Sequence, residues 1–192
     1  MKALNINTRN KINTLKQQAG MTLTESLLVL SVGALVAVLA YGGYKMATND
    51  VKTQSQAKGT VQLVGKIKQV FGTSASYGTA SASMYTTVKN AKILPADFKD
   101  NGTAFVNAWG GTVVPAVGAN TAQFTITFNG VPADGCIEFL NGVNSAASSG
   151  LTMGGTSVKT AAGDFDTAAA ATQCAASTSA TAATQVAVLT AQ

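Results

Sequence analysis

An unbroken run of uncharged residues from Leu27 to Tyr44 places the strongest constraint on how this chain can fold. As an α-helix these eighteen residues would extend about 27 Å, close to the ~30 Å hydrocarbon core of a membrane. The rest of the chain is too small to cover such a helix within its own domain. The run therefore predicts a helix that lies in lipid or one that assembles with other copies of the chain.

Beyond Lys45 the helical pattern continues in a different form. Apolar residues now recur at three- and four-residue steps, which is the pattern of a helix with one buried face. The stripe consists of Ala57, Val61, Val64, Ile67 and Phe71, with Thr60, Leu63 and Val70 beside it. We expect one helix over 21–71, apolar in its first half, amphipathic in its second, and about 75 Å long.

The remaining sequence predicts an antiparallel sheet. Its clearest strand is 122–128, where apolar residues alternate with threonines. A turn is expected at 107–111, a short helix after Pro132, and a surface loop over 144–183, where nearly all residues are Ala, Ser, Thr or Gly. Weaker extended segments are expected at 84–88, 102–106, 112–115 and 185–189. A long helix on such a sheet gives an α+β fold.

Charge separates the first twenty residues from the rest. Residues 1–20 contain no acid and carry four basic residues, Lys2, Arg9, Lys11 and Lys16. Without those four, nine basic residues face eight acidic ones, and the net charge falls from +5 to +1. A basic tract before an apolar run is typical of the cytoplasmic side of a membrane helix. The basic balance therefore predicts no nucleic-acid partner.

Reactive side chains are scarce. The sequence has no histidine, which excludes an imidazole base or an imidazole metal ligand. Asp164 and Asp166 could contact calcium, but two carboxylates without further oxygen ligands make a poor site. The sequence shows neither a nucleophile paired with a base nor a phosphate-binding loop. We therefore expect no enzyme, no metal site and no cofactor.

The two cysteines, Cys136 and Cys174, suggest one disulfide if the chain is exported, with two buried free thiols as the alternative. A bridge across 38 positions would stabilise the fold by about 4 kcal/mol in the loop-closure treatment. That is a large share of the ~5–15 kcal/mol that is typical of a whole domain.

The most specific motif lies at the start of the apolar run. It reads Gln18-Ala19-Gly20-Met21-Thr22-Leu23-Thr24-Glu25. A basic leader, a glycine, a hydrophobic residue and a glutamate at the fifth position after the glycine precede the uncharged segment. This combination resembles the type III signal of type IV prepilins, and the resemblance is sharp over 16–45.

The resemblance implies how the chain is processed. A membrane aspartyl peptidase, the prepilin peptidase, would cut between Gly20 and Met21 on the cytoplasmic side and methylate the new amine of Met21. Glycine at the cut allows extended backbone to enter a protease cleft unobstructed. Cutting before the apolar run leaves that helix on the mature protein, whereas an ordinary secretory signal loses its apolar segment.

Glu25 is the assembly carboxylate that the resemblance implies. A carboxylate at membrane depth costs about 2.5–3.5 kcal/mol on insertion scales, so such groups are candidates for function. Its natural partner is the positive amine of Met21 on a neighbouring subunit. That pair would neutralise both charges in a fibre core and fix the axial register.

The resemblance also implies an organisation and a function. The chain would comprise a cleaved leader, 1–20, a transmembrane and fibre-core helix, 21–45, and a globular head, 46–192. It would be the major subunit of a type IV pilus that serves adhesion, aggregation or conjugative mating. The subunit would wait in a bacterial inner membrane and then move to an extracellular pilus on the cell surface.

The partners follow from the same resemblance. They would be other copies of the chain in a helical homopolymer, the prepilin peptidase, an inner-membrane assembly platform with its ATPase, an outer-membrane secretin, and membrane lipid before assembly.

Further features resemble the type IVb subclass, the group of toxin-coregulated, bundle-forming and conjugative thin pili. They include the twenty-residue leader and Met21 at the first mature position. Residues 124–140 resemble the family's strand, turn and cysteine-bearing helix, and 107–111 resemble the thin-pilus group. Cys136 and Cys174 then match the family's disulfide-bounded D-region.

Other interpretations fit parts of the sequence. The segment could be an uncleaved signal anchor with Glu25 at the headgroup level, or Val38-Leu39-Ala40 could be an ordinary signal-peptidase site. A minor pilin or a type II secretion pseudopilin would share the processing signal. A membrane-anchored exported binding protein that never polymerises would keep Met1. Trp109 is more simply a buried aromatic near a turn than an adhesin contact.

Overall fold

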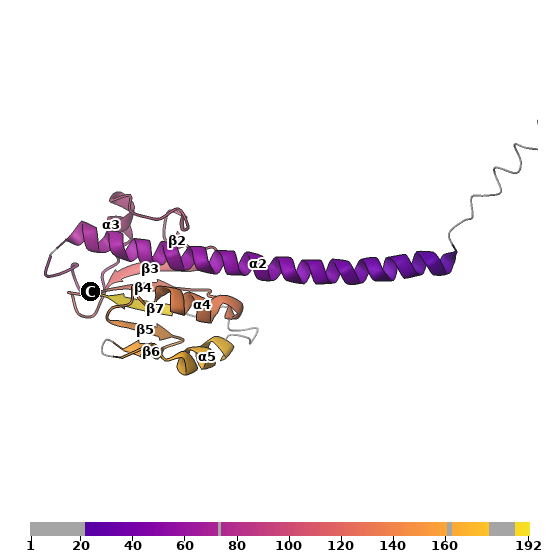
Figure 1. Cartoon of the computed structure of the whole chain (residues 1–192). Helices are drawn as coiled ribbons and strands as arrows, with labels where there is room; N and C mark the ends of the chain where they lie inside the picture. The colour runs from indigo at the N-terminus through magenta and orange to yellow at the C-terminus, as the bar shows by residue number, and fades with distance from the viewer. Residues whose placement is uncertain (1–21, 73, 161–162, 177–186) are drawn as a thin grey trace, which may run out of the picture. The chain divides into compact units, whose positions relative to one another are not determined.

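The chain forms two compact units, Met1–Lys45 and Met46–Gln192, and the second is called the head below. The computed structural model describes residues 22–72, 74–160, 163–176 and 187–192. The long helix α2, Leu23–Phe71, contributes to both units (Figure 1). The sequence predicted this helix over 21–71, and the described part of that range is helical almost throughout.

Within the head, one face of α2 is buried, and it carries both apolar and polar side chains. Its buried residues are Thr53, Gln56, Ala57, Gly59, Thr60, Leu63, Val64 and Ile67. Val61 and Val70 belonged to the predicted stripe, yet they remain 38% and 45% exposed. At about 100° per residue, Val61 lies beyond one edge of the buried face. Val70 is nearly in line with the buried Leu63, but it lies in the last turn of α2, which ends at Phe71.

Polar residues on this face, which apolar periodicity does not predict, bind the helix to its surroundings. Gln56 donates an amide N–H to the carbonyl oxygen of Asp97 at 2.6 Å, and Ser55 donates its hydroxyl to the Asp97 carboxylate. Thr53 packs on Gly135, where a Cβ would lie 2.2 Å from the threonine hydroxyl oxygen. The face therefore selects small and hydrogen-bonding side chains as well as apolar ones.

Across the described residues, the head builds a seven-stranded sheet in the order β1-β2-β3-β4-β7-β5-β6, and its neighbouring strands are antiparallel. The strands are β1 Lys99–Asp100, β2 Phe105–Val106, β3 Thr112–Val117, β4 Phe124–Phe128, β5 Gly150–Met153, β6 Thr156–Thr160 and β7 Ala187–Ala191. With the second part of α2 packed on this sheet, the predicted α+β class is confirmed.

Aromatic side chains join the helices to the sheet. The Tyr77 ring packs between those of Phe71 at the end of α2 and Phe124 of β4, with ring centroids 5.0 and 4.9 Å apart. Phe139 of helix α4, Ala133–Val143, meets Phe128 of β4 edge to face at 5.1 Å. The inward alternation of β4 and the helix after Pro132 are both as predicted, and Pro132 is the N-cap of α4.

The turn over 107–111 is confirmed and has a clear cause. The side-chain oxygen of Asn107 accepts hydrogen bonds from the N–H groups of Trp109 and Gly111 at 3.1 and 2.9 Å. A Cβ on Gly111 would lie 1.7 Å from the carbonyl oxygen of Asn129, so only glycine fits there. The following strand, β3, runs two residues further than the predicted 112–115.

One extended segment was predicted incorrectly, and a second matches a strand only in part. Residues 84–88 are not a strand, because helix α3 spans Tyr85–Asn90. Met84 and Val88 are both buried, and their spacing of four places them on one helical face. Only Phe105–Val106 of the range 102–106 is a strand.

The predicted surface loop over 144–183 is also wrong in its described part. It contains the hairpin β5–β6 and helix α5, Thr167–Ala175. Gly154 and Gly155 connect the two strands with φ values of +58° and +84°, as a two-residue hairpin of type I′ requires. The buried anchors of this region include Leu151, Met153, Val158 and Ala170.

The last strand of the chain lies inside the sheet. The sequence predicted a strand over 185–189, of which 185–186 lie outside the described residues. Strand β7, Ala187–Ala191, lies between β4 and β5 (Figure 1). Its backbone is in register with β4 through Phe128↔Ala187 and with β5 through Met153↔Ala187. The C-terminal residues therefore join the two parts of the sheet.

Candidate functional site

The first part of α2 presents an apolar surface. Its large apolar side chains from Leu23 to Tyr44 are 56–77% exposed. An 18-residue window of α2 has a mean hydropathy of 2.2 and none of it is buried, so by length and composition this helix could cross a membrane. Soluble monomers rarely expose apolar patches of this extent, so lipid or another protein has to cover the segment.

A reciprocal pair of hydrogen bonds begins this helix. The backbone N–H of Glu25 donates to the hydroxyl oxygen of Thr22 at 3.3 Å, and the backbone N–H of Thr22 donates to the Glu25 carboxylate at 3.2 Å. The Thr22 hydroxyl also donates to that carboxylate at 3.1 Å. This is a capping box, which satisfies free N–H groups at the start of a helix. Gly20 and Met21, the predicted cleavage site, lie outside the described residues.

Thr22 was not among the residues predicted from the sequence. The signal was available, because Thr22-Leu23-Thr24-Glu25 has the Ser/Thr-x-x-Glu spacing of a capping box directly before an apolar run. Glu25 therefore has a local role at the helix start, besides the assembly role that the resemblance implies. Its negative charge also complements the positive end of the helix dipole.

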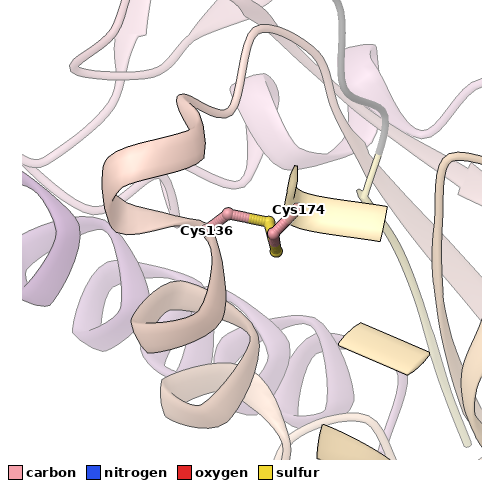
Figure 2. The surroundings of a disulfide bond; sticks show 2 residues. All are labelled: Cys136 and Cys174. Carbon is pink, nitrogen blue, oxygen red and sulfur yellow. A yellow bond between two sulfur atoms is a disulfide. The ribbon is translucent and has the colours of Figure 1, made fainter. Parts of the chain in front are cut away.

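A disulfide joins the two short helices of the head. Figure 2 shows Cys136 of α4 bonded to Cys174 of α5, with Cα atoms 5.7 Å apart. Both residues are buried, and neither is a free thiol. The bridge fastens α5 to α4 and closes a loop with a sequence separation of 38 residues.

The remaining candidates have structural roles. Trp109 is half-buried rather than buried, and its ring meets Phe139 edge to face at 5.4 Å. Asp166 caps α5, because its carboxylate accepts from the N–H groups of Ala168 and Ala169 at 2.9 Å. Asp164 is exposed. In the part of the chain that the structure describes, no cluster of three His, Cys, Asp or Glu residues could hold a metal ion.

A comparison with known protein families identifies the family of this chain. A family model described as PilS N terminal matches residues 49–190, well over half of the 192-residue chain. The chain belongs to this pilin-related family. The match covers both cysteines and leaves out Glu25. It therefore rests on the PilS-family head, independently of the motif before the apolar run. No curated protein and no solved structure matches the chain.

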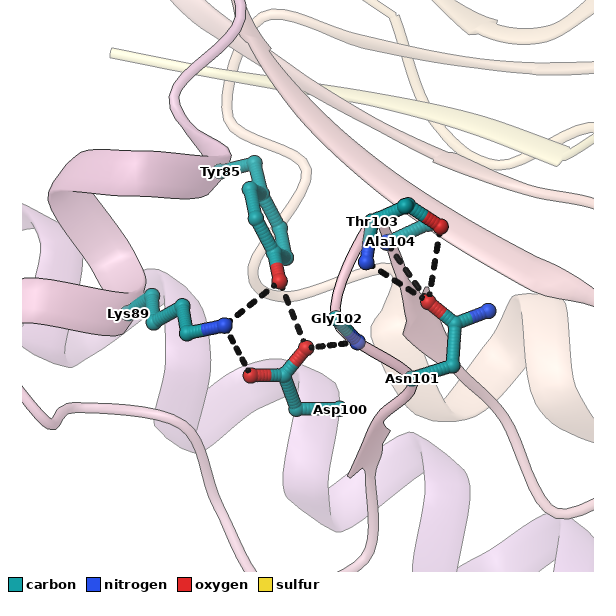
Figure 3. A network of polar contacts seen from close by, with 7 residues as sticks. All are labelled: Tyr85, Lys89, Asp100, Asn101, Gly102, Thr103 and Ala104. Carbon is teal, nitrogen blue, oxygen red and sulfur yellow. Dashed lines mark hydrogen bonds and ion pairs between the residues drawn. The ribbon is translucent and has the colours of Figure 1, made fainter.

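A polar cluster on the surface of the PilS-family head joins α3 to the β1–β2 hairpin (Figure 3). The Tyr85 hydroxyl donates to the Asp100 carboxylate at 2.6 Å, and the Lys89 ammonium lies 2.9 Å from its other oxygen. The Gly102 N–H also donates to Asp100 at 2.9 Å. The Tyr85 hydroxyl, followed by Lys89 and Gly102, lowers the pKa of Asp100 from 3.8 to about 2.

This cluster predicts that a variant without the Asp100 carboxylate is less stable than the wild type at neutral pH, and that the difference disappears in acid. Because the pKa of Asp100 is lower in the folded chain, its contribution is complete above pH 3.8 and is lost as the pH falls towards about 2. Asp100→Asn should therefore lower the unfolding midpoint at neutral pH, and the two proteins should converge near pH 2. Thermal unfolding of the full chain in detergent between pH 7 and pH 2 measures this.

A control is Asp164→Asn, since Asp164 is an exposed carboxylate outside the helices and strands. It should not reproduce the pH-dependent difference. A deficit of the Asp100→Asn variant that is unchanged at the lowest pH would contradict the assigned role of the charged carboxylate.

Proposed function

We propose that the chain is the precursor of a type IV pilin of the type IVb subclass, and that it is the major subunit of a surface pilus. The observation that carries this proposal is a wholly exposed apolar helix continuous with a disulfide-bonded PilS-family head. One part of the subunit has to leave water, whereas the other is a folded domain with a polar surface. Polymerisation satisfies both, because it buries helices against helices and leaves the heads in solvent.

Processing prepares the subunit for this assembly. Prepilin peptidase cuts between Gly20 and Met21, and the new amine of Met21 is methylated. The apolar part of α2 then holds the subunit in the inner membrane until the assembly platform and its ATPase extract it. The fibre leaves the cell through a secretin. Glu25 pairs with the Met21 amine of a neighbouring copy, and the subunit carries out no enzymatic step.

The experiment that tests the proposal is intact mass and N-terminal sequencing of protein from sheared surface material. We expect a chain that begins at Met21, carries one added methyl group and lacks two hydrogens because of the disulfide. Its abundance in the sheared fibres distinguishes a major pilin from a minor pilin or a secretion pseudopilin. A chain that begins at Met1 would point to an anchored, non-polymerising protein, and one that begins at Tyr41 to an ordinary secreted protein.

A further inference from the structure

A groove of about 470 Å³ lies between α2 and α4 of the head. Ala57 of α2 and Gly142 of α4 both line it, and a Cβ on the glycine would lie 2.6 Å from the Cβ of Ala57. Because these residues are so small, the two helices approach closely at this point. Val61, 38% exposed, also lines the groove.

The chemistry of the groove suits an uncharged, apolar occupant. Lys58 on the α2 wall and Glu138 on the α4 wall carry opposite formal charges, so the lining has no net charge. Gln54 and Gln62 also line the groove, and all four of these polar residues are exposed. Their polar ends can therefore stay in water, which leaves the side chains of Ala57 and Val61 for an apolar occupant.

The chain itself carries an element with the matching chemistry. The run from Leu27 to Tyr44 has no charge, and its large apolar side chains are exposed. Among the described residues of the head, large exposed apolar side chains are few, namely Met46, Val51, Val61, Val70, Val114 and Ile137. In a homopolymer, the surface that most needs a partner is therefore the apolar part of α2.

We propose that the groove between α2 and α4 receives the apolar part of α2 from a second copy. This rests on the proposed polymerisation and specifies a surface of the head that takes part in it. Groove and helix are different surfaces, so the contact is heterologous and can repeat from copy to copy without closing. If the two helices are parallel and Val36 of one copy lies beside Lys58 of the other, the two copies are displaced by about 33 Å along the helix axis.

Val61 and Val114 provide a matched pair of test positions, because both are 38% exposed and Val114 lies on β3. Full-length Val61→Asp and Val114→Asp subunits are expressed in place of the wild type, and sheared fibres are quantified. Val61→Asp should reduce fibre yield by about tenfold or more, because a charge would be buried against an apolar helix. Val114→Asp and Val61→Leu should remain within about twofold of the wild type, because the first changes a surface position away from the groove and the second keeps an apolar side chain in it.

Folding and processing are checked on the same samples. The Val61→Asp subunit in membranes should begin at Met21 and retain its disulfide, which excludes loss of the subunit as the cause. Wild-type fibre yield from Val61→Asp would overturn the groove proposal and leave the pilin function intact. Absence of fibres from the wild-type chain itself would instead overturn the proposed function.

A photoreactive side chain at position 61 identifies the occupant directly. In wild-type fibres it should cross-link to a peptide from 23–45 of another copy, and the same group at position 114 should not. Cross-links at position 61 to lipid alone, or to another part of a head, would overturn the assignment.

Discussion

Glu25→Gln is expected to leave processing and folding intact and to reduce fibre yield by about tenfold or more. The glutamine keeps the capping box, because its side-chain oxygen can still accept from the N–H of Thr22. It removes only the negative charge. If that charge pairs with a Met21 amine in the fibre core, its loss leaves a buried cation without a partner, which costs several kcal/mol. The measurement is fibre yield by shearing, with the N-terminus of the membrane subunit sequenced in parallel.

Thr22→Ala is the matched control for this experiment. It removes the hydroxyl that accepts from the N–H of Glu25 at 3.3 Å and keeps the carboxylate. Loss of a cap typically costs about 1 kcal/mol, a small amount for a helix as long as α2, Leu23–Phe71. Fibre yield from Thr22→Ala should therefore stay close to that of the wild type. The reverse pattern, in which Thr22→Ala fails and Glu25→Gln assembles, would show that the cap rather than the charge is required.

The features that the sequence predicted well depend only on residues that are close together along the chain. The length and lack of charge of Leu27–Tyr44 predict an apolar helix without reference to any other segment. The alternation in β4, Phe124–Phe128, likewise predicts which side chains face the core. Both patterns are local, because a helix or strand face repeats at a fixed period along the chain.

The features that could not be predicted depend on partners distant in sequence. Gln56 is buried on α2 because its amide donates to the Asp97 backbone 41 positions away, and no local pattern indicates that contact. The strand β7 shows weak alternation, but its place inside the sheet depends on register with both β4 and β5.

The prediction for the region after α4 failed for a different reason. It is made of small residues, and few large anchors, such as Leu151 and Met153, mark its strands. The adjacent glycines Gly154 and Gly155 were a hairpin signal that composition concealed, because a segment rich in Ala, Ser, Thr and Gly is typical of a loop. The disulfide compensates for the small apolar surface that these residues can bury.

Loss of the disulfide is expected to lower the free energy of unfolding of the head by about 4 kcal/mol, from the closed-loop length of 38 residues. Apart from the disulfide, helix α5 buries little apolar surface, since its buried residues are Ala170 and Cys174. It packs against α4, β5 and β6, and β5 pairs with the C-terminal strand β7. Release of α5 should therefore spread to the hairpin and to β7, while β1–β4 retain their own pairing.

Two ways of removing the disulfide distinguish the effect of the covalent bond from the effect of the buried sulfur atoms. Wild-type protein in reductant keeps both thiols in the core, and Cys136→Ala/Cys174→Ala removes them. Both should unfold at a lower denaturant concentration than the oxidised protein, and the reductant should have no further effect on the double variant. Hydrogen exchange should increase first in α5, Thr167–Ala175, and in β5. Unchanged stability after reduction, with the free thiols verified, would mean that burial of the helices holds this region without the covalent bond.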